Sequence, residues 1–140
     1  MINKDVLYQK TNSIQNCLKR IHDTVAGDLN RLQNLDVQDI VVLNLQRATQ
    51  LIIDMGAYII ATRLWGIPQS LKDIFVILEQ NKALSHALSQ NLQKMVGFRN
   101  IAMAMNDYLA VDPEILKAVI SKHLQDFENF YSEILKNIHD

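Results

Sequence analysis

The chain has 140 residues, 49% of them hydrophobic, so it is long enough to bury one core and too short for two comfortable domains. We therefore expect a single domain over residues 1–140. Its 14 basic and 15 acidic residues nearly cancel. This balance excludes a strong overall field that would draw the protein to nucleic acid or to a membrane, so any contact with nucleic acid has to be local.

Neither export nor membrane insertion fits the pattern of residues. Cys17 is the single cysteine and has no partner for an internal disulfide, and the first 19 residues lack the pattern of a signal peptide. Charged residues interrupt the longest apolar stretches, so no run approaches the roughly 20 residues that span a bilayer. We expect a cytoplasmic protein with no membrane contact.

Apolar residues recur at helical spacing, and only 4 glycines and 2 prolines punctuate the chain, which predicts an all-α protein. A first helix covers Leu7 to Val25 and ends near Gly27. A second helix begins between Asp36 and Asp39 and ends before "WGIPQS".

Three further helices follow after this break. Ser70 is placed to cap a short third helix, and either Ser85 or Ser89 begins the fourth. Asp112 caps a fifth helix with Pro113 in its first position, and this helix continues through Ile134.

Long amphipathic helices joined by short loops predict an up-and-down antiparallel four-helix bundle with one short accessory helix. Two stretches, "DIVVLNLQ" and "DMGAYIIATRLW", carry more apolar residues than one bundle-facing stripe needs. A homodimer interface would use this surplus, and a wide core face accounts for it equally well.

An arginine interrupts the apolar stripe of the fourth helix. The spacing of this stripe leads from Met95 to Arg99, and Asn106 lies within roughly 20° of Arg99 on the same helical face. Burying an unpaired guanidinium costs several kcal/mol, so Arg99 needs a carboxylate, carbonyl groups, a partner subunit or an anionic ligand. Gly97 is either tolerated by chance or kept small for the close approach of another backbone. The carboxylates considered for an ion pair are Asp54, Asp107 and Asp126.

Four segments in order carry a resemblance to a known family. They are "VLNLQRATQLIIDMGAYII", "WGIPQSLKDIFVILEQNKALS", "LSQNLQKMVGFRNIA" and "HLQDFENFYSEI". Together they resemble the HepT-like toxins of the HEPN superfamily, which belong to toxin and antitoxin pairs.

The resemblance implies a helical bundle that dimerises and cleaves RNA without a metal or another cofactor, at a site where two copies of the fourth helix meet. It also implies a partner, a minimal nucleotidyltransferase (MNT) antitoxin that adds adenylyl groups to a tyrosine beside the motif. Arg99 and Asn100 match the start of the family motif, and Tyr108 matches its end.

The motif histidine of the family is missing. Metal-free RNA cleavage uses the 2′-hydroxyl as nucleophile, so a histidine suits its deprotonation and an arginine suits the charged phosphorane. The histidine would fall on Ala104 when counted from Arg99, or on Asn106 when counted back from Tyr108, because "AMAMNDY" is two residues longer than the usual pattern. Asparagine has no proton equilibrium near neutrality. We therefore predict a severely impaired RNase, since acid–base help is worth ~10²–10⁴-fold.

Two other functions remain open. The bundle is alternatively a non-catalytic substrate-binding or regulatory subunit of a nucleotidyltransferase pair, or a structural helical dimer in which Arg99 only forms an ion pair.

Among the other histidines and cysteines, His22 and His139 lack the spacing of metal ligands, so we expect no metal site. Cys17 is interpreted as a small core residue, and His123, beside Phe127, as a core or interface residue.

Overall fold

The computed structural model describes residues 2–105 and 112–138, without the side chains of residues 98–105. Within these ranges every regular element is helical, which confirms the predicted all-α class. In chain order the elements are α1 (Lys4–Val25), the 3-10 helix η1 (Leu29–Gln33), α2 (Leu35–Arg63), α3 (Leu71–Gln80), α4 (His86–Met105), α5 (Pro113–Lys122) and α6 (Leu124–Asn137).

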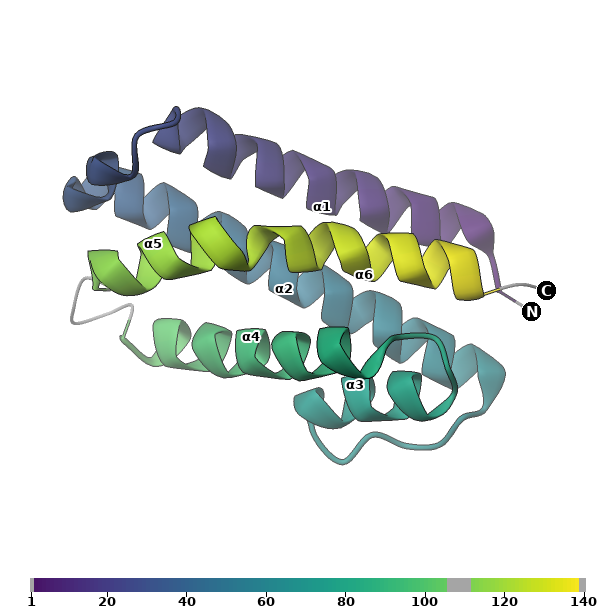
Figure 1. Ribbon diagram of the computed structural model, residues 1–140. Coiled ribbons are helices and arrows are strands. Elements are labelled where there is room, and N and C mark those ends of the chain that lie inside the picture. Colours follow the sequence, from purple (N-terminus) through teal and green to yellow (C-terminus); the bar gives the residue numbers. More distant parts are fainter. Residues whose placement is uncertain (1, 106–111, 139–140) are drawn as a thin grey trace.

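The long helices form the predicted antiparallel bundle. Figure 1 shows α1, α2, α4 and the pair α5 and α6 alternating in direction, so that both termini lie at one end. The short helix α3 lies against α2 and α4 at the same end of the bundle as the α2–α3 connection. The expected four-helix bundle with a short accessory helix is thus confirmed.

Side-chain caps fix where the helices begin, because the first backbone N–H groups of a helix have no partner inside it. Ser70 accepts from the N–H of Asp73 at 3.1 Å, and Asp112 accepts from the N–H of Glu114 at 2.9 Å, both as predicted. Of the two serines considered for α4, Ser85 is the cap, since its Oγ accepts from the N–H of Leu88 at 3.3 Å.

The sequence analysis missed one element, and one of its predictions was wrong. A 3-10 helix, capped by Asp28, was not expected between α1 and α2. The last helix is not continuous, because His123 departs from helical geometry with φ −121° and ψ −7°. The buried positions follow this break: they step by five residues from Val119 to Leu124, whereas a straight helix keeps one face with steps of three or four.

The core runs along the centre of the bundle and contains three fully buried phenylalanines, Phe75, Phe127 and Phe130. Phe75 of α3 and Phe130 of α6 pack edge to face, with ring centroids 6.2 Å apart. Six apolar residues of the two wide stretches of α2 are buried in this core, as a wide core face requires: Val41, Val42, Leu45, Met55, Ile59 and Ile60. Exposed apolar residues nonetheless remain on or beside α2, namely Leu35, Ile40, Leu43, Leu64 and Ile67.

Gly56 lets α3 approach α2 closely. A Cβ at this position would lie 2.5 Å from Cγ2 of Ile74 and 3.2 Å from Cδ1 of Leu78. Because such separations are shorter than van der Waals contact, only glycine fits without a shift of α3. This contact seats the accessory helix that supports α4.

Candidate functional site

The predicted motif begins on the C-terminal part of α4. Arg99 and Asn100 lie within this helix, while their side chains are outside the described part of the structure. Asn106 and Tyr108 lie outside the described residues altogether. The roles assigned to these four residues, and the ion pair considered for Arg99, therefore stay predictions.

Hydrogen bonds with two neighbouring helices, α3 and α6, hold α4 and its N-terminal loop in place. The buried hydroxyl of Ser89 donates to the carbonyl of Phe75 in α3 at 3.1 Å. The N–H of Ser85 donates to Glu133 of α6 at 2.7 Å, and the Asn137 amide donates to the carbonyl of Ala83 at 3.0 Å. These bonds fix α4 against both α3 and α6, which gives the motif a rigid support.

Gly97 does not face a neighbouring backbone among the described residues. A Cβ built there would lie 3.8 Å from Nζ of Lys72, the far end of an exposed and flexible side chain of α3. The close-approach interpretation of Gly97 therefore has no counterpart among the residues that the structure describes. The contact instead places a lysine ammonium beside α4, two residues before Arg99.

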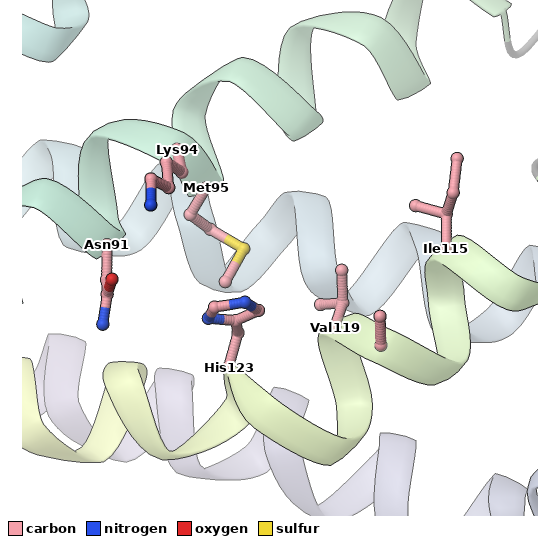
Figure 2. A pocket seen from close by; sticks show the side chains of 7 residues that line it. Asn91, Lys94, Met95, Ile115, Val119 and His123 are labelled. Carbon is pink, nitrogen blue, oxygen red and sulfur yellow. The ribbon is translucent and has the colours of Figure 1, made fainter.

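A groove of about 270 Å³ lies between α4 and α5, on the stretch of α4 that leads to Arg99. Figure 2 shows Met95 and His123 pointing toward each other from the two sides of this groove. Its lining is mainly apolar, with polar groups on α4 and at the end of α5. The described lining residues are Asn91, Lys94, Met95, Ile115, Ala118, Val119 and His123.

A hydrogen-bonded set orders the polar end of the groove. Nδ1 of His123 lies 3.0 Å from Oδ2 of Asp126, and the other carboxylate oxygen accepts from the Asn91 amide at 3.4 Å. Asp126 is 5% exposed, whereas the His123 side chain is 35% exposed. Because a carboxylate only accepts, Nδ1 carries the proton and Nε2 is the acceptor in the neutral imidazole.

The sequence interpretation found only part of this set. His123 was expected to be a core or interface residue, and it is half-buried at the edge of the groove. Asp126 was considered only as a partner of Arg99, and its described partners are His123 and Asn91. The available signal was a carboxylate three residues after a histidine and four before the core residue Phe130, which puts Asp126 on the buried face.

Other reactive groups lie away from this groove. Cys17 is buried, and burial raises the pKa of its thiol, against the smaller lowering effects of Arg47 and Arg20. In the described residues no three His, Cys, Asp or Glu side chains come together as metal ligands. None of the described helices is long and apolar enough to cross a membrane.

Comparison with known proteins places this bundle among HepT proteins. The family described as "Ribonuclease HepT-like" matches residues 14–134. The mRNA nuclease HepT of Shewanella oneidensis strain MR-1 is 40% identical over 130 residues, which cover 93% of this chain and 96% of the relative.

Two solved structures have the same fold. A toxin–antitoxin complex with AMP-PNP contains a chain 40% identical to this one, with a TM-score of 0.88 and coverage of 95% of this chain and 99% of that chain. The tri-AMPylated Shewanella oneidensis HEPN toxin, in complex with its MNT antitoxin, is 39% identical, with a TM-score of 0.87 and coverage of 97% and 100%.

Proposed function

Since the chain belongs to the HepT-like family, we propose that it is the toxin of a toxin–antitoxin pair, built on the scaffold of a metal-independent endoribonuclease. The observation that carries this proposal is the match over residues 14–134, which includes the whole of α4 and the motif start at Arg99. The ordered support of α4 by α3 and α6 is what a site on one rigid helix requires.

The chemistry assigned to the motif follows from its residue types. Arg99 supplies a permanent cation with a fork of N–H donors, which suits the negative charge that develops on the phosphorane. Asn100 is placed to hold the phosphate or to orient Arg99. If two copies of α4 form the site, a homodimer would bring Arg99 and Asn100 of both subunits to one RNA strand.

We infer that this chain is severely impaired as a nuclease, because the position of the family histidine is occupied by Asn106. An amide cannot take the proton of the 2′-hydroxyl at neutral pH. Without acid–base help, a loss of ~10²–10⁴-fold in cleavage rate is expected.

The partner of this toxin is a minimal nucleotidyltransferase antitoxin, and Tyr108 is its target. The related Shewanella toxin is tri-AMPylated and in complex with an MNT antitoxin, which supports the kind of partner and the kind of modification. Tyr108 is assigned as the target because it matches the end of the family motif. An adenylyl group on Tyr108 would add bulk and a negative phosphate to the motif, and a phosphate that binds Arg99 would compete with RNA for the same cation.

Restoring the histidine tests the nuclease proposal. Deleting Ala104 and Met105 together with Asn106→His gives the family spacing, and the same deletion with Asn106 retained is the matched control. We expect the histidine variant to cleave single-stranded RNA ~10²–10⁴-fold faster than the control. If both stay equally inactive while fold and dimer are intact, the nuclease assignment is wrong for this scaffold.

A second candidate function follows from Asn106 itself, since a chain without the proton-transfer residue also suits a non-catalytic regulatory subunit. Mass spectrometry after incubation with ATP and the cognate antitoxin distinguishes the two. Adenylyl additions at Tyr108 support the toxin, and a stable complex with no mass change supports the regulatory subunit.

A further inference from the structure

The groove between α4 and α5 has the features of a small ligand site. Met95 and Val119 are buried and form its apolar surface, and Ile115 is 48% exposed at its side. Asn91 and His123 supply its polar groups, and Lys94 of α4 adds an exposed cation to the lining. An apolar surface with a few convergent polar groups is typical of ligand pockets, and about 270 Å³ is at their small end.

His123 is held in one orientation at this groove. Its position at the junction of α5 and α6 and its bond to the buried carboxylate of Asp126 restrict the ring. With Nδ1 bonded to Asp126, the edge of the ring bearing Nε2 is left for a ligand donor. Asn91, held by the other carboxylate oxygen, adds a second polar group on the opposite wall.

The position of the groove identifies the class of ligand. Arg99 lies four residues beyond Met95, which is about 6 Å further along the helix axis. This separation is about that of one nucleotide, so when an RNA phosphate binds at Arg99, the adjacent nucleotide of the same strand can reach the groove. A nucleobase is flat and apolar on its faces and carries donors and acceptors on its edge, which matches the apolar walls and the polar end.

We propose that this groove is a base-binding subsite for the RNA, holding the nucleotide next to the phosphate at Arg99. The base packs between Met95 and Val119, Asn91 and His123 bind its edge, and Lys94 contacts the backbone. Asp126 is a positioning residue, because it acts through His123 and Asn91. This inference rests on the proposed function, since it requires RNA to bind along α4.

Filling the groove is the sharpest test. Ala118 lines it and is exposed, so Ala118→Trp occupies the space without disturbing the core, and the exposed Ala57 of α2 offers Ala57→Trp as a matched control. Binding of short single-stranded RNAs is measured by fluorescence anisotropy. We expect Ala118→Trp and Asn91→Ala to weaken binding about tenfold or more, as the loss of one stacked base does, and Ala57→Trp to bind as the wild type does.

Oligonucleotides with a single abasic position distinguish binding of a base from binding of the phosphate backbone, because they keep every phosphate and lack one base. The wild type should lose affinity about tenfold at one abasic position, and Ala118→Trp should no longer distinguish that position. If Ala118→Trp and Asn91→Ala bind RNA as well as the wild type while Arg99→Ala does not, the groove is no subsite and the proposed function stands. If the wild type binds no RNA, both the base-binding subsite and the proposed function are wrong. If Ala118→Trp instead dissociates a dimer in light scattering, the groove is a subunit interface and the inference is overturned.

Discussion

The contact at Gly56 gives a sharp prediction for the packing that supports α4. In Gly56→Ala the new methyl would meet Cγ2 of Ile74 at 2.5 Å, whereas carbon atoms in contact are about 3.5–4.0 Å apart. Ile74 is β-branched and has essentially one side-chain rotamer in a helix, so its methyl group has no alternative position. Roughly 1 Å of movement therefore falls on α3 itself.

The magnitude follows from two opposing effects. Overpacking of this kind costs about 1–3 kcal/mol, and the rigid neighbour places Gly56→Ala in the upper half of that range. Alanine is favoured over glycine in a helix by about 1 kcal/mol. The net loss in the free energy of unfolding is therefore about 1–2 kcal/mol, which lowers Tm by roughly 3–8 °C for a chain of this size.

Gly97→Ala is the matched control, because the same substitution in α4 meets only the end of a lysine side chain at 3.8 Å. The helix-propensity gain is common to both variants, so their difference, about 2–3 kcal/mol, isolates the clash. Thermal unfolding followed by circular dichroism at several protein concentrations measures it. Ile74→Leu removes the offending methyl and should partly rescue Gly56→Ala. Equal stability of the two alanine variants would refute the close-packing argument.

Two further predictions concern ionisable groups. The hydrogen bond from His86, at 2.8 Å, lowers the pKa of Glu79 below its ordinary value of 4.5. The ionised carboxylate therefore stabilises the folded state above pH 4.5, and this stabilisation is lost as the pH falls through the lowered pKa. Unfolding titrations of wild type and Glu79→Gln should differ above pH 4.5 and converge in more acidic solution, and a constant difference would contradict the assignment. Burial raises the pKa of Cys17, so a thiol reagent should label it far more slowly in the native protein than in urea. Equal labelling rates would show that Cys17 is accessible.

Much of the architecture was predictable because it depends on local patterns. Helical spacing of apolar residues located the helices, and caps such as Ser70 and Asp112 fixed their starts with hydrogen bonds that span only two or three residues. Short connections then left the antiparallel bundle as the simplest way to bury the stripes. The break at His123 escaped this approach, because the apolar spacing continues through it while the buried face changes.

The sequence by itself also determined the family. The order of four segments identified HepT, and the count between Arg99 and Tyr108 predicts that the motif histidine is missing, since both follow from residue order.

Only the tertiary structure decided which residues share a site. Asn91 and His123 are brought together because α4 and α6 pack side by side around Asp126, 35 residues after Asn91. Gly56 likewise proved to be the closely packed glycine and Gly97 the open one. No local pattern encodes such contacts, because they depend on how whole helices are positioned by the core.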